Sequence, residues 1–209
     1  MARFRIASTR RMHAALAAAA SDWTAVQSDG HAAQYGALYG VLHALAASNY
    51  ESARRLAEHP RIVGRAAELA TSTHVLRWWQ CMPDPQRPER IAASTAPHNG
   101  DAALARDHEA LFHVFMNGGW TSLAHTWAEQ LQKSTEPHPA LESIHLASFS
   151  HEINALRALG RFDEARDRAG SHIGVTSDLF GTELDDGSID AGESLEVTAA
   201  WRKMAYVEL

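Results

Sequence analysis

Apolar residues recur along this chain at the spacings of three and four that place side chains on one face of a helix. The segment 141–159 shows the pattern with five residues expected in the core: Ile144, Leu146, Phe149, Ile153 and Leu156. An earlier stripe of apolar residues is expected to face a partner helix: Tyr35, Leu38, Tyr39, Leu42 and Leu45. No segment alternates apolar and polar residues for long enough to predict a strand. The pattern therefore predicts an all-α fold.

A short pattern recurs where one helix is expected to turn into the next. A turn-forming or polar residue precedes an aromatic residue, and a small or aliphatic residue follows three positions later. The aromatic residues of the four copies are Trp23, Tyr50, Trp120 and Phe162. Because positions three apart share a helical face, we expect these aromatic side chains to wedge between paired helices. Two-helix units of roughly 30 to 45 residues are typical of helical solenoids.

The last copy also carries a family resemblance. Its residues form the sequence Leu159-Gly160-Arg161-Phe162-Asp163-Glu164-Ala165. This stretch resembles the turn and second-helix start of the tetratricopeptide repeat, and Phe149 stands where the first-helix aromatic residue of that family is expected. Ile153 does not match the family's small residue, and the closing proline is missing after Ala169. The resemblance implies irregular tetratricopeptide-like hairpins, arranged as a short superhelix or a compact bundle.

The composition is that of a single globular domain. The chain has 209 residues, of which 45% are hydrophobic and 21% charged, and this length is sufficient for one substantial core. We therefore expect one helical domain over residues 1–209. Within it, the polar and acidic segment 174–192 is expected to form a loop before a C-terminal helix.

Charge and cysteine content narrow the classes of partner and compartment. The formal net charge of −6 argues against nucleic acid as the main partner, because phosphate binding requires concentrated positive charge. Cys81 is the single cysteine, which excludes an intramolecular disulfide and a cysteine-based zinc site. The pair Arg10-Arg11 before an alanine-rich run is similar to an export signal, but alanine supplies a weak apolar region and forms helices well. We expect a cytoplasmic protein that does not cross a membrane.

The thirteen histidines are the unusual feature of the composition. Glu142 and His145 form one Glu-x-x-His motif, whereas di-iron bundles need two such motifs and further carboxylates. The residues that would build a hidden site are Glu109, His113, Glu142, His145 and His151. Without a second motif, the sequence predicts no catalytic residue, no metal and no cofactor. A helical-bundle enzyme or metal protein that uses such a histidine/glutamate cluster stays the alternative.

Two sets of residues are candidates for binding a partner. The first is acidic and lies in the expected loop: Glu183, Asp185, Asp186, Asp190 and Glu193. Such a loop is either a solvated linker or an electrostatic docking surface for a basic partner. The second set is Trp78 and Trp79, which are either core residues or an aromatic binding surface.

These observations predict a non-enzymatic module that binds a protein or peptide, and neither nucleic acid nor membrane. In general character, small acidic all-helical proteins of this kind resemble the immunity proteins of bacterial toxin systems, which occlude a cognate toxin. A small-ligand sensor with an aromatic pocket is a third alternative.

Overall fold

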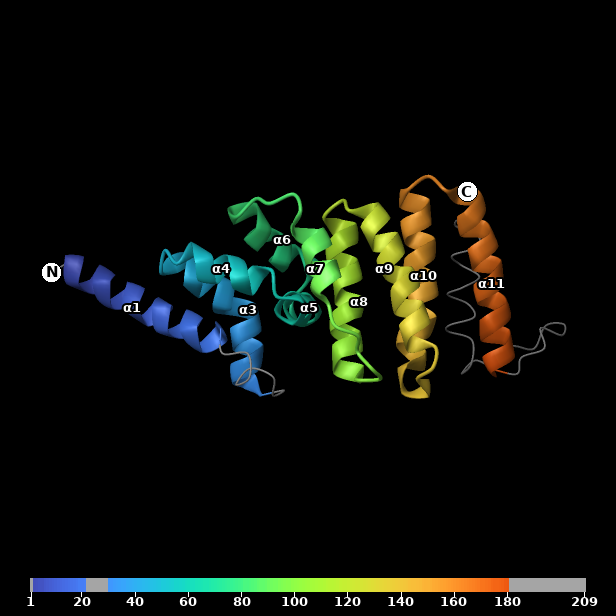
Figure 1. The fold of residues 1–209 in the computed structure, drawn as a ribbon, viewed down its shortest axis with the longest axis horizontal. Helices are drawn as coiled ribbons and strands as arrows, with labels where there is room; N and C mark the ends of the chain where they lie inside the picture. Colours follow the sequence, from blue (N-terminus) through green and yellow to red (C-terminus); the bar gives the residue numbers. More distant parts are fainter. Residues whose placement is uncertain (1, 22–29, 181–209) are drawn as a thin grey trace. The chain divides into compact units, whose positions relative to one another are not determined.

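The computed structural model describes residues 2–21 and 30–180, and the structural statements below concern these residues (Figure 1). This part of the chain contains ten α-helices, one short 3-10 helix and no strand, so the predicted all-α class is confirmed. The first six helices are α1 (Ala2–Ser21), α3 (His31–Ala46), α4 (Tyr50–Ala57), α5 (Pro60–Leu69), α6 (Ser72–Cys81) and α7 (Arg87–Ser94). They are followed by α8 (Ala102–Asn117), α9 (Thr121–Thr135), the 3-10 helix η1 (Pro139–Leu141), α10 (Glu142–Ala158) and α11 (Phe162–Phe180).

The helices divide into two compact units, and the expectation of one helical domain over residues 1–209 stays a prediction. The first unit comprises Met1–Pro97 and Arg106–Gly119, and the second comprises His98–Ala105 and Trp120–Leu209. Helix α8 begins in the second unit and continues into the first.

Small residues decide how the first unit packs. In α3 the buried positions are Ala33, Gly36, Ala37, Gly40, Val41 and Ala44. At Gly40 the neighbouring helix comes so close that an added Cβ would lie 2.7 Å from the Cβ of Ala20 in α1. The expected apolar stripe lies on the other side, where Tyr35, Tyr39 and Leu42 are exposed. The predicted inner face of α3 is therefore wrong, because the small residues permit a closer helix contact than the larger ones do.

In the second unit, α10 lies beside both α9 and α11 (Figure 1). The five core residues predicted in the segment 141–159 are all buried, so this prediction is confirmed. On one side, Ile153 and Leu156 pack with Ala165 and Ala169 of α11. On the other side Ile144 packs in a second cluster of buried residues: Ala105, Leu131, Leu141 and Ile144.

The recurring aromatic pattern marks a recurring turn. Three copies lie in the described part of the chain. In each, a residue with positive φ stands one or two positions before the aromatic residue: Ser48 (59°), Gly119 (86°) and Gly160 (73°). At Gly160 the backbone N–H bonds the carbonyl of Arg157 at 3.0 Å, and the N–H of Arg161 bonds that of Leu156 at 2.9 Å. This pair of bonds satisfies the last carbonyl groups of α10 and turns the chain into α11.

Two of the aromatic side chains after these turns, Tyr50 and Phe162, do not wedge between helices as predicted, whereas Trp120 is partly buried. Tyr50 is 65% exposed and Phe162 is 53% exposed, whereas Ala53 and Ala165, three positions further on, are fully buried. Both aromatic residues are the first of their helices. Because Cα–Cβ bonds tilt toward the helix N-terminus, a side chain at the first position projects past the end of the helix. The prediction was therefore wrong for these two residues, and Trp23 lies outside the described residues.

Helix α11 continues to Phe180, so the expected loop does not begin at residue 174. The remainder of the predicted loop and the predicted C-terminal helix lie outside the described residues. No helix in the described part of the chain is both long enough and apolar enough to cross a membrane.

His98 in the second unit leads to a prediction about pH. The residue is buried, its Nδ1 accepts the N–H of Gly100 at 3.2 Å, and its Nε2 then donates to Ser134 Oγ at 2.9 Å. Burial, and secondarily the neighbouring His138, lowers the pKa of His98 below its ordinary value. The unfolded chain therefore takes up a proton at His98 more readily than the folded chain does. At high pH the imidazole is neutral in both states, and protonation of the unfolded chain lowers the stability of the fold as the pH falls through the ordinary histidine range.

We expect the free energy of unfolding to decrease between about pH 7 and pH 5. Urea titrations across this range will measure the slope, and His98→Gln, which cannot take up a proton, should reduce it. An unchanged slope in the variant would show that His98 does not contribute to this pH dependence.

Candidate functional site

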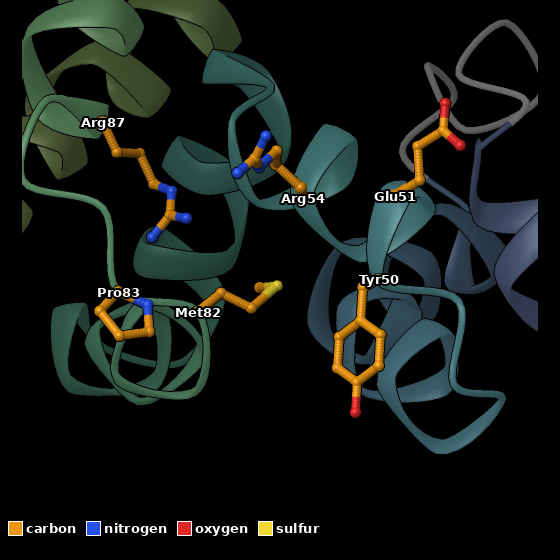
Figure 2. Close-up of a pocket in the computed structure, with 6 residues that line it drawn as sticks. All are labelled: Tyr50, Glu51, Arg54, Met82, Pro83 and Arg87. Atoms are coloured by element: carbon orange, nitrogen blue, oxygen red, sulfur yellow. The ribbon is translucent and has the colours of Figure 1, made fainter.

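The first unit contains a hollow of about 360 Å³ that we call the arginine pocket (Figure 2). Its walls come from the start of α4, the turn after α6 and the start of α7. The lining residues are Tyr50, Glu51, Arg54, Met82, Pro83 and Arg87. The local sequence fixes these walls, because Asn49 caps α4 through its side-chain oxygen and Pro83 prevents α6 from continuing.

Arg87 is the most unusual side chain of the pocket because it is a cation that is only 2% exposed. Its guanidinium carbon lies 5.8 Å from the centre of the Trp79 ring. Its Nε lies 3.6 Å from Glu58 Oε1, which is a charge pair but too long for a hydrogen bond. Both Nε and Nη1 are buried without a hydrogen-bond partner. Burial lowers the pKa of Arg87 and the neighbouring carboxylates oppose this, and a guanidinium stays charged at neutral pH.

A network of charges surrounds Arg87. Glu58 Oε1 also lies 2.9 Å from Arg90 Nη2 and 3.8 Å from Arg54 Nε. Arg90 donates a second bond to Asp84 at 2.6 Å, and this bond is the main reason that the pKa of Asp84 falls to about 2. Three guanidinium groups thus share two carboxylates, and the network carries one positive charge in excess.

The side chains of the pocket point in different directions (Figure 2). The guanidinium groups of Arg54 and Arg87 point toward one another, and the thioether of Met82 extends toward Tyr50 (Figure 2). The carboxylate of Glu51 points away from both arginines (Figure 2). The pocket therefore offers two cations at one side and an apolar surface at the other.

The structure describes only one of the two sets of residues predicted to bind a partner, the pair Trp78 and Trp79. Trp78 and Trp79 are both buried, as expected of core residues and not of an exposed binding surface. Trp79 donates its indole N–H to the carbonyl of Ala57 at 3.1 Å, and the guanidinium of Arg87 lies over its ring. The acidic set, Glu183, Asp185, Asp186, Asp190 and Glu193, lies outside the described residues.

The second unit contains another hollow, of about 400 Å³, lined by residues of α9, α10, α11 and the turn that joins α10 to α11. Three of its lining residues, His125, Glu129 and Glu152, each place one potential metal-ligating atom within 4.8 Å of the others. Glu152 is buried and accepts a bond of 2.6 Å from Arg168 Nε. The same guanidinium also donates to the side-chain oxygen of Gln132. An arginine therefore already neutralises one of the three donors.

Sequence reasoning did not find this cluster. The five residues expected to build a hidden site divide between the units: Glu109 and His113 lie in the first, and Glu142, His145 and His151 lie in the second. Among the residues that the structure describes, the group of three donors is His125, Glu129 and Glu152 instead. The spacing of four between His125 and Glu129 was a usable signal, because such residues share a helical face. Glu152 comes from another helix, and its spacing carries no such information.

The chain matches no protein-family model, no curated protein and no solved structure. Similarity therefore identifies neither tetratricopeptide repeats nor immunity proteins, and the fold is shown at the level of an all-helical structure.

Proposed function

We propose that this chain is a non-enzymatic interaction module that binds a protein or peptide through the arginine pocket. The observation that carries the proposal is the lining of this pocket. Tyrosine, methionine and arginine are enriched in protein interfaces, and this hollow combines Tyr50, Met82 and two arginines. Tyr50 in particular leaves a large aromatic ring in solvent that the first unit does not use for its own core.

The proposal includes a more specific architecture and role. The turns at Ser48, Gly119 and Gly160 support irregular tetratricopeptide-like hairpins, in which successive helix pairs are joined by similar turns. The net charge of −6 favours encounter with a partner that carries basic surface. Neutralisation of a cognate toxin in the bacterial cytoplasm is the specialisation that we propose, and the acidic segment from Glu183 to Glu193 would help to steer such a partner.

Affinity capture with matched baits tests the proposal. The bait variant combines Tyr50→Ala with Arg54→Ala, two side chains that are largely exposed. The control combines Tyr39→Ala with Arg77→Ala, which removes the same residue types from exposed positions of the same unit. We expect the wild-type chain and the control to retain one protein from an extract of the source organism, and the pocket variant to lose it. Equal capture by all three baits would contradict binding at the arginine pocket.

The cluster of His125, Glu129 and Glu152 favours a second candidate function, that of a metal protein. One imidazole and two carboxylates are suitable ligands for zinc or a related divalent metal. This candidate predicts that isothermal titration with Zn²⁺ shows one equivalent bound, and that His125→Ala abolishes it. His31→Ala, at an exposed histidine of the first unit, is the control. Absence of a stoichiometric site, or its persistence in His125→Ala, would eliminate the candidate.

A further inference from the structure

We propose that the arginine pocket receives one carboxylate, carried by an aspartate or glutamate side chain of the partner that has an apolar residue beside it. The inference rests on the proposed function and specifies the chemistry of its site. Arg87 and Arg54 are the groups that bind the carboxylate, and Tyr50 and Met82 contact the adjacent apolar side chain.

The buried guanidinium of Arg87 lacks hydrogen-bond acceptors for two of its nitrogens. A buried guanidinium usually has acceptors for its N–H groups, because desolvated donors without partners are unfavourable. Here two nitrogens of Arg87 lack a hydrogen-bond partner, and its nearest carboxylate oxygen, on Glu58, is shared with two other arginines. A carboxylate entering the pocket supplies an acceptor for one of these two nitrogens and pairs it with Nη2, because Nε and Nη1 lie on different edges of the guanidinium. The guanidinium carbon of Arg87 lies over the Trp79 ring, 5.8 Å from its centre, so the indole gives the cation a cation–π contact.

The charge of the network is the second argument, and it distinguishes among anions. The network around Glu58 does not include Glu51, whose carboxylate points away from the arginines (Figure 2). This network has one positive charge in excess, which one carboxylate neutralises. A phosphate group carries about −1.5 to −2 charges at neutral pH. The negative charge of the phosphate beyond −1 would repel the carboxylate of Glu58, which lies only 3.6 Å from Arg87. The charge balance therefore favours a carboxylate over a phosphate.

The apolar side of the pocket is the third argument. Tyr50 projects beyond the start of α4, and Met82 extends toward it from the turn after α6 (Figure 2). These two side chains, together with Pro83, form an apolar surface next to the arginines. An isolated carboxylate would leave this surface uncovered, whereas an acidic residue with an apolar neighbour covers both sides of the pocket.

The probe for the experiment is a pentapeptide with blocked ends and one glutamate between two leucines. Matched peptides carry glutamine or phosphoserine in place of the glutamate, and isothermal titration against the full chain measures all three. We expect the glutamate peptide to bind about 10- to 100-fold more tightly than the glutamine peptide, the range for a hydrogen bond to a charged group. The phosphoserine peptide should bind more weakly than the glutamate peptide. Blocked ends ensure that the side chain supplies the carboxylate.

Variants of the protein locate the binding. Arg54→Gln should weaken binding of the glutamate peptide by about 2- to 5-fold, as expected for an exposed ion pair. Arg87→Lys keeps the charge but loses the paired geometry, and should weaken it by about 10-fold or more. Arg77→Gln, at an exposed position of the same unit, should have no effect. Arg54→Gln changes an exposed side chain, so it keeps the test decisive even if Arg87→Lys does not fold.

Three results would overturn the inference: no binding of the glutamate peptide up to roughly 5 mM, equal binding of the glutamine peptide, or tighter binding of the phosphoserine peptide. If the partner retained in affinity capture still depends on Tyr50 and Arg54, the interaction function stands and only the carboxylate inference fails. If the Tyr50→Ala and Arg54→Ala variant retains the same protein as the wild-type chain, both proposals fail.

Discussion

Replacing Phe149 with alanine is expected to destabilise the second unit by about 3 to 5 kcal/mol, the usual cost of removing a large buried aromatic side chain. Phe149 is only 6% exposed. Its ring stacks on His172 with the centres 5.0 Å apart, and the guanidinium carbon of Arg168 lies 5.1 Å from the ring centre. The substitution leaves a cavity and also removes the surface on which Arg168 rests while it neutralises Glu152.

Phe162 is the matched control, because it belongs to the same unit and undergoes the same chemical change. It is 53% exposed, so Phe162→Ala should cost less than about 1 kcal/mol. Urea unfolding followed by circular dichroism will compare the two variants. Equal losses would mean that Phe162 packs against the helices after all, as the recurrence of the aromatic pattern first led us to expect.

Replacing Gly64 with alanine is expected to destabilise the first unit by about 1 to 3 kcal/mol, because it introduces a methyl group where there is no space. A Cβ at this position would lie 2.5 Å from the backbone oxygen of Asp107 and 2.9 Å from its Cβ. Backbone atoms cannot turn aside as a flexible side chain can, so α5 and α8 would have to separate. The higher helix propensity of alanine, worth about 1 kcal/mol, only partly compensates.

Gly170 provides the opposite case with the same substitution. It lies within α11, and an added Cβ would have nothing within 4 Å. Gly170→Ala should therefore stabilise the chain by about 0.5 to 1 kcal/mol. Thermal melts of both variants will show the difference in sign. A Gly64→Ala chain that melts at or above the wild-type temperature would mean that α5 and α8 do not approach as closely as described.

The all-α class and several helix ends could be predicted from the sequence because they depend on nearby residues. The apolar spacing in 141–159 is sufficient to form α10, and Gly160 is sufficient to end it, since glycine readily adopts the positive φ of that turn. Pro83 likewise prevents α6 from continuing. The core of α10 was predicted correctly because it has apolar residues on the sides that meet α9 and α11.

Only the tertiary structure decided which side of a helix is covered and which polar groups meet. In α3 the sequence offers an aromatic stripe and a row of small residues, and close packing at Gly40 buries the small ones. The arginine pocket joins side chains from α4, α7 and the turn after α6, and among them Arg87 is buried. Spacing along the chain records neighbours within one helix, whereas these contacts depend on the distance at which separate helices meet.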